Sequence, residues 1–418
     1  MPPQRVQGRG RFTVVLHVES RTRAADLTNF HRVRMLAACS LGGSGHLNPL
    51  LPFLAAARLA GHEVLVIAPP AMRRRLSDEG LPFHEGGEPN ESDVAEIREQ
   101  LARASRAKAT VLGNRELFGR LAATAMLPSM TAVCEQWQPD LILREPCEYA
   151  SAFVAGAMGI RTAQVAISTA AAELGSIAAA APVLETYRPG LAQELEVAPY
   201  LTRFPLFMDP PLFSSTYRYR EAPLRAARPL PDWWSGSRAP LIYVTFGSVL
   251  GHMDIAAQVF SMALKVASQL RGLRFLMTVG RGFDISTLGP IPAHVHVESW
   301  VQQADALAEA ALVVCHGGSG TVLGSLAAGV PLVAVPLFAD QFSNAAQVAA
   351  EGAGVVVEIP RDGTGSRTPE DFSRSASGVV LAVEKMLTEP SFTAAAVSVA
   401  GELASRRSPG DVLAELSQ

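Results

Sequence analysis

The stretch Leu312–Leu326 reads LVVCHGGSGTVLGSL, an apolar run followed by a glycine-rich turn and then by residues with a helical pattern. The run Leu312–Cys315 predicts a buried strand. Glycines in the turn that follows let backbone amides approach an anion closely, and the amino-terminal end of a helix adds positive potential. The turn His316–Thr321 therefore suits a phosphate or a pyrophosphate, with the hydroxyls of Ser319 and Thr321 as further donors. Taken alone, the turn is also compatible with tight packing and no ligand.

The same alternation of strand, turn and helix recurs along the whole chain. In the second half we predict a helix and five strands: Ile255–Leu270, and Leu241–Phe246, Arg274–Val279, Val295–Val297, Leu312–Cys315 and Leu332–Val335. In the first half we predict four strands and two helices: Val33–Cys39, Glu63–Ala68, Leu141–Leu143 and Thr162–Ile167, and Leu50–Leu59 and Ala150–Met158. This pattern predicts an α/β protein of two facing, Rossmann-like, doubly wound parallel-sheet domains. Ligands in such folds bind at the carboxyl ends of the strands, here in the cleft between the domains.

The chain length and the positions of polar and proline-rich stretches set the expected domain limits. A chain of 418 residues suits two domains of roughly 200 residues each. Residues 1–31 are polar and rich in arginine, and they predict a flexible extension. The many prolines between Tyr187 and Trp234 predict irregular chain. We therefore expect domains at 32–215 and 239–418 with a linker at 216–238, and we leave the last helix free to cross back to the first domain.

Composition excludes several classes of function. Lysine and arginine number 36 against 39 acidic residues, so the net charge is −3 and no basic stripe indicates a nucleic-acid partner. The sequence contains no run of about 18 uninterrupted apolar residues, so no membrane span is predicted. The amino terminus lacks the pattern of a secretory signal, so a cytoplasmic location is expected.

Ligand spacing predicts no metal site. The four cysteines lie far apart in the chain, which favours reduced and buried thiols: Cys39, Cys134, Cys147 and Cys315. His294 and His296 would share one face of a strand, but further ligands for a metal are not identifiable.

The flanks of the glycine-rich turn show a longer ordered pattern. Trp300 and Gln303 precede the turn, and Gly329-Val330-Pro331, Asp340-Gln341 and Asn344 follow it. Trp300–Gly354 resembles the donor-binding signature of family 1 glycosyltransferases, which have the GT-B fold. The resemblance extends over most of the chain, from about Val33 to about Leu403. It implies an acceptor-binding domain at 32–215 and a nucleotide-sugar-binding domain at 239–418.

The resemblance implies a role for each part of the signature. Trp300 and Gln303 would flank the nucleobase, since an aromatic ring can stack on a pyrimidine and an amide can bond to it. The turn would hold the diphosphate, with the Gly247-Ser248 loop nearby, and Asp340 and Gln341 would bind sugar hydroxyls. The implied donor-binding set is Gly45, Gly247, Ser248, Trp300, Val301, Gln303, His316, Gly318, Ser319, Gly320, Thr321, Asp340 and Gln341.

One departure from the family pattern bears on the nucleotide. Family members that use nucleotide-diphosphate glucose often carry a glutamate three positions after the residue that matches Thr321, where it binds the ribose hydroxyls. This chain has Gly324 there. Loss of the carboxylate fits a deoxyribose donor, which lacks the 2′-hydroxyl, so dTDP is favoured over UDP.

A second motif, Gly45-His46-Leu47-Asn48-Pro49, follows the first predicted strand. The resembling family places its general base here, and imidazole titrates near neutral pH. His46 is therefore the expected base, although a loop histidine is more often an ordinary polar residue. The family commonly supplies an aspartate partner after the strand near Leu141–Leu143, where this chain has Glu145. A solvent-facing Glu145 is the alternative, and Glu148 is the less favoured substitute.

These assignments predict an inverting transfer of a sugar, with nucleotide sugar as co-substrate and no cofactor. An Asp-x-Asp motif is absent from the sequence, which favours catalysis without a metal. The expected acceptor is a hydrophobic natural product such as a polyketide, by analogy with bacterial antibiotic glycosyltransferases. Three alternatives are a lipid or sterol glycosyltransferase that uses UDP-sugar, a nucleotide-sugar epimerase, and a non-catalytic partner of another glycosyltransferase. A homodimer is left open.

Overall fold

A computed structural model describes residues 32–41, 43–220, 226–360 and 367–416, and the predicted extension 1–31 lies outside them. The described chain forms two compact units. One contains the described residues before Gly43, Gly61–Ala163 and Ser176–Ala198, and the other contains Gly43–Ala60, Gln164–Gly175 and the described residues from Pro199 onward. The predicted domain limits at 32–215, 216–238 and 239–418 stay predictions.

The first sheet, within the described residues, has seven strands in the order β3-β2-β1-β4-β5-β6-β7. Their bounds are Arg34–Ala38 (β1), Glu63–Ala68 (β2), Phe83–Glu85 (β3), Leu141–Arg144 (β4), Arg161–Val165 (β5), Tyr200–Thr202 (β6) and Thr216–Arg218 (β7). β1 pairs in parallel with β2 on one side and with β4 on the other, where Ala38 lies beside Arg144. The strand order reverses between β1 and β4, and the carboxyl ends of these two strands form the switch point at which such sheets bind ligands.

The second sheet repeats this arrangement in the order β10-β9-β8-β11-β12-β13. Its strands are Leu241–Thr245 (β8), Arg274–Thr278 (β9), Val295–Glu298 (β10), Ala310–Cys315 (β11), Leu332–Ala334 (β12) and Gly354–Val356 (β13). β8 and β11 are parallel neighbours, and Cys315 lies beside Thr245 at their carboxyl ends. The strand order reverses here, so this is the second switch point, and the predicted Rossmann-like topology is confirmed in both sheets.

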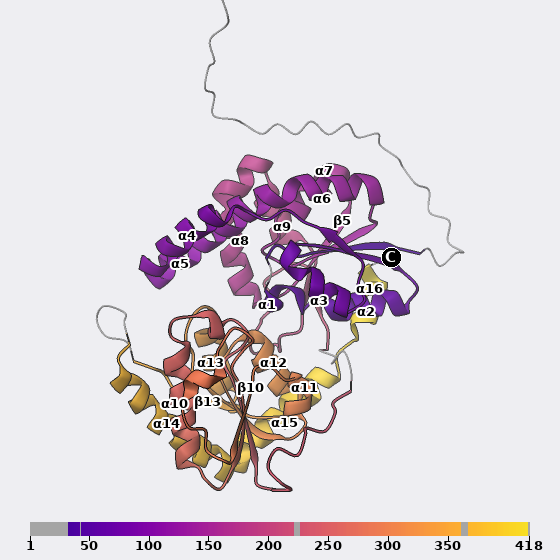
Figure 1. Ribbon diagram of the computed structural model, residues 1–418. Coiled ribbons are helices and arrows are strands. Elements are labelled where there is room, and N and C mark those ends of the chain that lie inside the picture. Colours follow the sequence, from indigo (N-terminus) through magenta and orange to yellow (C-terminus); the bar gives the residue numbers. More distant parts are fainter. Residues whose placement is uncertain (1–31, 42, 221–225, 361–366, 417–418) are drawn as a thin grey trace, which may run out of the picture. The chain divides into compact units, whose positions relative to one another are not determined.

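Alternate side chains of the second sheet enter two different cores. Val244 and Met277 join the core that includes α10 (Ala256–Gln269) and α14 (Pro369–Thr388). Their neighbours Tyr243 and Leu276 join the core that includes α12 (Ser319–Ala327) and α15 (Pro390–Ala404). Figure 1 shows these helix pairs on opposite sides of the sheet. Burial of both faces explains why the strands read as continuous apolar runs in the sequence.

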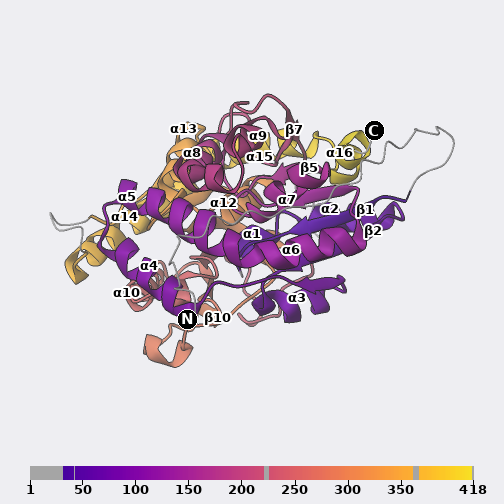
Figure 2. The same ribbon diagram turned by 90° about the horizontal axis from the view of Figure 1, so that it is seen from above.

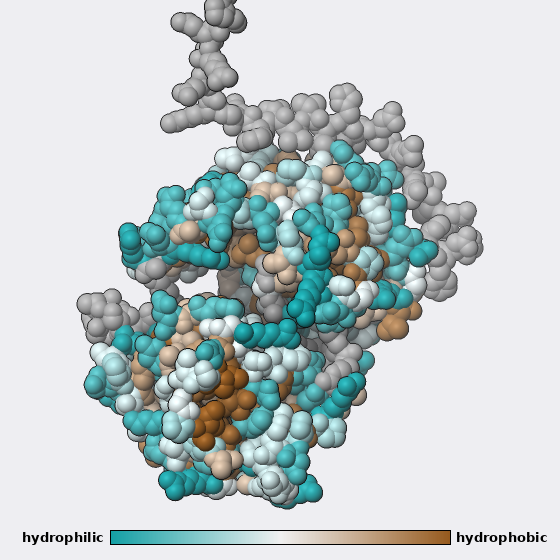
Figure 3. All heavy atoms as spheres, viewed as in Figure 1, coloured by the Kyte–Doolittle hydropathy of each residue, from teal (hydrophilic) through white to brown (hydrophobic). Residues whose placement is uncertain are grey.

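In the first unit, α6 (Ala123–Trp137) and α7 (Ala150–Met158) pack against β1 and β4. Figure 2 shows α6 running along the strands of this sheet. The helical stretch Lys108–Trp137, which ends with α6, is long and apolar enough to cross a membrane by length and composition alone. Core helices pass the same test, and Met130 and Val133 of this stretch are buried in the core. Hydrophilic side chains cover the neighbouring helices α4 (Glu91–Arg103) and α5 (Arg106–Leu112) in Figure 3.

The expectation of irregular chain from Tyr187 to Trp234 is wrong at three places. The structure has α9 (Leu191–Val197), β6 and β7 in this stretch. Tyr200 is fully buried and stacks on Phe213, with 4.4 Å between the ring centroids. The short strands β6 and β7 pair in parallel with each other. Pairing and burial thus stabilise strands that are too short to be indicated by a sequence pattern.

The last described helix packs within the second unit. α16 (Pro409–Leu416) packs against α2 (Leu51–Leu59). The chain before α16 is joined to the end of β7, because Arg220 N donates to the Arg407 carbonyl at 2.9 Å. Tyr219 lies beside Arg407 and places its ring against Phe53, with 4.6 Å between the centroids.

The four cysteines are buried, and His294 and His296 each contact neighbouring residues of the protein. None of the four cysteines forms a disulfide in the part of the chain that the structure describes. The His296 ring stacks on Trp233 with 4.0 Å between centroids, and its Nε2 lies 2.9 Å from Glu298. His294 Nε2 lies 2.9 Å from the Ala267 carbonyl.

Candidate active site

The glycine-rich turn lies at the switch point of the second sheet, between the end of β11 and the start of α12. Gly317 has φ +82°, a conformation that side chains with a Cβ rarely adopt. A Cβ on Gly317 would lie only 2.8 Å from the backbone oxygen of Gln341. Asn344 Nδ2 donates to the Gly317 carbonyl at 3.0 Å, and this hydrogen bond helps to fix the turn. Gly320 in the first turn of α12 is exposed, which leaves this position of the helix start accessible to an anion.

The His316 ring fits between two glycines. A Cβ on Gly318 would lie 2.4 Å from His316 Nε2, and a Cβ on Gly247 would lie 2.9 Å from the same atom. Burial lowers the pKa of His316 to about 4, although the Asp340 carboxylate acts in the opposite direction. His316 is therefore neutral near pH 7, its ring N–H is directed to the Thr245 backbone carbonyl, and positive potential comes from the end of α12.

We expect His316 to lower the stability of the protein in mild acid. Its pKa is about 4 in the folded chain and about 6.5 in an unfolded one, so the unfolded state binds an extra proton between these values. Stability is then lost as the pH falls through this window, by about 1–2 kcal/mol at pH 5. In His316→Gln, urea unfolding at pH 7 and pH 5 should show a smaller difference than in the wild type. An unchanged difference, with His62→Gln as the control, would contradict the burial argument.

Asp340 is held by three donors that all reach the same oxygen. Ser319 Oγ donates to Asp340 Oδ2 at 2.7 Å, Asn344 Nδ2 at 3.2 Å and Ser168 Oγ at 3.4 Å. Asn344 is fully buried and Ser319 nearly so, whereas Asp340 is half-buried. Among the described residues no donor reaches Oδ1. One carboxylate oxygen is thus fixed and the other is available to a hydroxyl of a ligand.

Gln341 is anchored in a different way. Its Oε1 accepts hydrogen bonds from the backbone N–H groups of Leu337 at 2.8 Å and Phe338 at 3.0 Å. Its side chain is buried. The sequence predicts that Gln341, together with Asp340, binds sugar hydroxyls. With its oxygen engaged, the side-chain amide group is left as the donor.

The predicted nucleobase end is open. Trp300 is 52% exposed, and the Arg281 guanidinium lies 5.4 Å from its ring centroid. Val301 packs against the core beneath α12. A Cβ on Gly324 would lie 3.2 Å from the Gln303 amide, so the glycine also makes room for that side chain.

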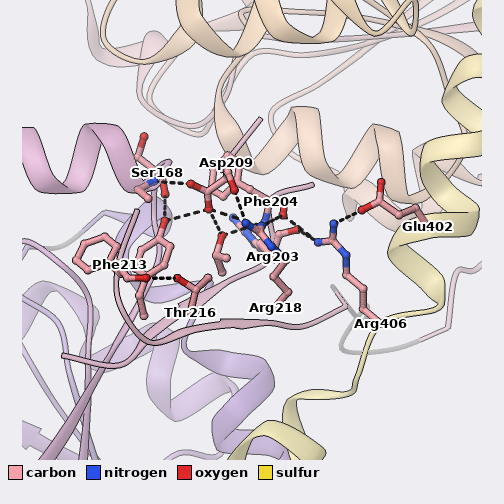
Figure 4. Close-up of polar contacts among 12 residues, drawn as sticks. Ser168, Arg203, Phe204, Asp209, Phe213, Thr216, Arg218, Glu402 and Arg406 are labelled. Atoms are coloured by element: carbon pink, nitrogen blue, oxygen red, sulfur yellow. Dashed lines mark hydrogen bonds and ion pairs between the residues drawn. The ribbon is translucent and has the colours of Figure 1, made fainter. Parts of the chain in front are cut away.

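Sequence reasoning missed Ser168, which reaches Asp340 from the loop between β5 and α8 (Ala170–Tyr187). Buried groups hold this loop, as Figure 4 shows for Ser168 and Asp209. Glu173 accepts from Ser168 N at 2.8 Å, Tyr200 donates to the Ser168 carbonyl at 2.9 Å, and Asp209 accepts from Ala170 N at 2.6 Å. Its position directly after a predicted strand is the one signal that could have indicated it.

At the switch point of the first sheet, Glu145 is fully buried, so the alternative of a solvent-facing Glu145 is wrong. Its Oε1 accepts from Ser40 N at 3.1 Å and from Ser40 Oγ at 2.5 Å. Its Oε2 accepts from Cys147 N at 2.8 Å. Hydrogen bonds from N–H and O–H groups stabilise the charged form of a carboxyl.

Glu148 has a separate task. Its two oxygens accept from Ala150 N and Ser151 N, both at 3.0 Å, and so cap the start of α7. Burial raises the pKa of Glu148. The buried Arg144 donates to the carbonyls of Glu148 and Pro146, at 2.8 and 2.5 Å. The local structure thus accounts for Glu148 without a role at the base.

His46 lies in α1 (Ser44–Leu47), a single helical turn. His46 N donates to the Gly43 carbonyl at 3.1 Å, and the side chain is half-buried. The fully buried side chains of Leu47 and Leu50 anchor the turn.

The structure brings most of the predicted donor residues together within one unit. Gly247, His316 and Gly318 are in contact, Gln303 touches Gly324, and Ser319 binds Asp340. Ser248 and Gly320 are exposed near the turn, and Thr321 is buried in the first turn of α12. Gly45 is exposed beside His46. His46 and Glu145 belong to different compact units, and their pairing stays a prediction.

Solved structures share this architecture. The glycosyltransferase SnogD from Streptomyces nogalater matches with a TM-score of 0.68 and 22% identity, over 92% of this chain and 99% of that one. The spinosyn rhamnosyltransferase SpnG matches with a TM-score of 0.75 and 20% identity, over 92% of this chain and all of that one. With two parallel-sheet domains and the glycine-rich turn at a switch point, the protein has the GT-B glycosyltransferase fold.

Sequence comparison then identifies the family. The N- and C-terminal domain models of erythromycin biosynthesis protein CIII-like proteins match residues 55–189 and 281–418. The elloramycin glycosyltransferase ElmGT of Streptomyces olivaceus is 32% identical over 397 residues, which cover 89% of this chain and 94% of that protein. The L-demethylnoviosyl transferase of Streptomyces niveus is 30% identical and covers 77% of this chain and 84% of that protein. The chain belongs to the erythromycin biosynthesis protein CIII-like family, and it is a glycosyltransferase of the natural-product type.

Proposed function

We propose that the protein transfers a deoxysugar from a dTDP-activated donor to a hydroxyl of a hydrophobic natural product, with inversion and without a metal. The observation that carries the proposal is the donor end of the second unit. There the α12 amino terminus, a neutral His316 and the one-sided anchoring of Asp340 form a site for a diphosphate and a sugar hydroxyl. Relatives support the choice of donor, since SpnG and SsfS6 have been solved in complex with thymidine diphosphate.

The proposed reaction is a direct displacement. His46 takes the proton from the acceptor hydroxyl as its oxygen forms a bond to the anomeric carbon. The bond from that carbon to the diphosphate oxygen breaks, and its electron pair leaves with the nucleotide diphosphate. Backbone N–H groups at the start of α12 stabilise the departing charge. Glu145 stabilises the imidazolium that forms on His46.

The acceptor assignment is supported by the names of the relatives. One is a tylactone mycaminosyltransferase of Streptomyces fradiae, 26% identical over 410 residues. SpnG has been solved with spinosyn aglycone. Incubation of this protein with donor alone separates the epimerase alternative, which predicts an epimerised nucleotide sugar. Proton NMR of the product reports inversion at the anomeric carbon.

We expect dTDP to stabilise the protein more than UDP or GDP does in a thermal-shift assay at equal ligand concentration. A ligand that binds the folded state raises its apparent stability with the ratio of concentration to Kd. Gly324→Glu should shift the preference towards UDP, because the new carboxylate could bind the ribose 2′-hydroxyl. Gly324→Ala is the matched control, since it meets the same Gln303 amide but adds no carboxylate. Stabilisation by none of the three nucleotides would overturn the proposed function.

A further inference from the structure

We propose that Ser40 is a positioning residue for the transfer reaction, because it holds the Glu145 carboxylate that supports the base. The inference rests on the proposed function, in which His46 is the base and Glu145 its partner. Ser40 directly follows the β1 end and Glu145 directly follows the β4 end. Since Ala38 and Arg144 are register partners, the two residues meet at the switch point of the first sheet.

The contact is buried and short. Glu145 is fully buried and Ser40 is 3% exposed. Ser40 Oγ lies 2.5 Å from Glu145 Oε1, a distance typical of a hydroxyl that donates to an ionised carboxylate. A carboxylate removed from water is costly unless donors replace the lost hydration. The Ser40 hydroxyl therefore favours the charged state of Glu145 and a single orientation of it.

Ser40 and Cys147 supply three donors to Glu145, and one of these three depends on residue type. Ser40 N and Cys147 N are backbone groups that any residue except proline would supply. The hydroxyl of Ser40 comes from the side chain. A substitution at position 40 therefore removes one donor and leaves the other two in place, which makes the contribution measurable without dismantling the site.

Other ionisable groups near Glu145 include Glu148, Cys39 and Arg144. Glu148 caps α7, and the negative charge of Glu145 disfavours a negative charge on Glu148, which raises its pKa in addition to the effect of burial. Burial raises the pKa of the Cys39 thiol well above its ordinary value, and the charge of Glu145 adds to the effect, so Cys39 is neutral near pH 7. Arg144 donates to the backbone carbonyls of Pro146 and Glu148.

The test is a double-mutant cycle on kcat. Ser40→Ala should lower kcat about tenfold, as expected for loss of one hydrogen bond to a charged group, and leave KM for the sugar donor within about twofold. In a Glu145→Gln background the same substitution should change kcat by less than about twofold, because no charge is left to position. The Ser40→Ala profile of kcat/KM should also move its acid limb to lower pH. A loosely held carboxylate raises the pKa of the base less.

Two further variants serve as controls, one that retains the hydroxyl at position 40 and one that removes a different serine hydroxyl in the same unit. Ser40→Thr retains the hydroxyl and should restore kcat to within about threefold of wild type. Ser129→Ala is the matched control in the same unit, because its hydroxyl accepts from Gly87 N at 3.1 Å and donates to the Met126 carbonyl at 3.0 Å. It should leave kcat unchanged. An equal loss from Ser40→Ala in both backgrounds, or no loss in either, would overturn the role of Ser40.

Failure of the inference is distinguishable from failure of the proposed function. If His46→Ala abolishes transfer and Ser40→Ala has no effect, only the role of Ser40 is wrong. If His46→Ala retains transfer, or if dTDP does not bind, the proposed function itself is wrong.

Discussion

Replacing His46 by alanine is expected to lower kcat by roughly 10²–10⁴-fold, the usual contribution of a positioned general base. We expect the alanine variant to bind the acceptor and the donor still, while the attacking hydroxyl would have to lose its proton to water. The short turn of α1 is anchored by Leu47 and Leu50, so the loss of the imidazole should leave the backbone in place. Steady-state kinetics with a dTDP-deoxysugar and a polyketide aglycone measure the effect. Calorimetry should show that the Kd for dTDP changes by less than about threefold.

His62→Ala is the matched control for this experiment. Its side chain is half-buried like that of His46, and His62 lies in the loop before β2. Its Nδ1 accepts from Val33 N at 3.3 Å, at the amino end of the strands rather than the carboxyl end. Ligands bind at carboxyl ends in such sheets, so this variant should keep transfer activity. A His46→Ala enzyme that works as well as His62→Ala would remove the assigned base.

The elements that the sequence predicted well are those with both faces buried. Glu63–Ala68 and Ala150–Met158 have the predicted bounds, and the other predicted strands differ by one or two residues at their ends. A continuous apolar run is a strong signal because a parallel strand covered on both sides has no polar face. β6 and β7, with three residues each, have no such run, and their stability comes from the buried Tyr200 and from pairing.

The candidate site was predictable where the ligand-binding residues lie close together in the sequence, as in Trp300–Gln341. It was less predictable where residues distant in the sequence meet. Ser168 reaches Asp340 over a separation of 172 residues, and Ser40 reaches Glu145 over 105 residues. These contacts follow from sheet topology, which local pattern does not specify. Both switch points thus contain a carboxylate that accepts from a serine hydroxyl, Asp340 from Ser319 and Glu145 from Ser40.

Replacing Gly317 by alanine is expected to remove dTDP binding, with at least a hundredfold rise in Kd, and to lower stability by about 2–4 kcal/mol. The added Cβ would need φ +82° and would lie 2.8 Å from the Gln341 backbone oxygen. Because that neighbour is backbone rather than a flexible side chain, relief requires the turn or the start of α13 (Gln341–Ala350) to move. Either movement misplaces the α12 amino end and loosens Asp340, which adjoins α13.

Gly401→Ala in α15 separates this effect from a general response of the fold to alanine. Apart from its chain neighbours and the backbone of its own helix, no heavy atom of the described residues lies within 4 Å of a Cβ at Gly401, and its φ is not positive. Alanine is a better helix former than glycine by about 1 kcal/mol, so this variant should be as stable as wild type or more stable, with unchanged dTDP affinity. Urea unfolding reports stability, and calorimetry reports affinity at a temperature where both variants are folded. A folded Gly317→Ala protein that binds dTDP within about threefold of wild type would show that the turn does not hold the diphosphate.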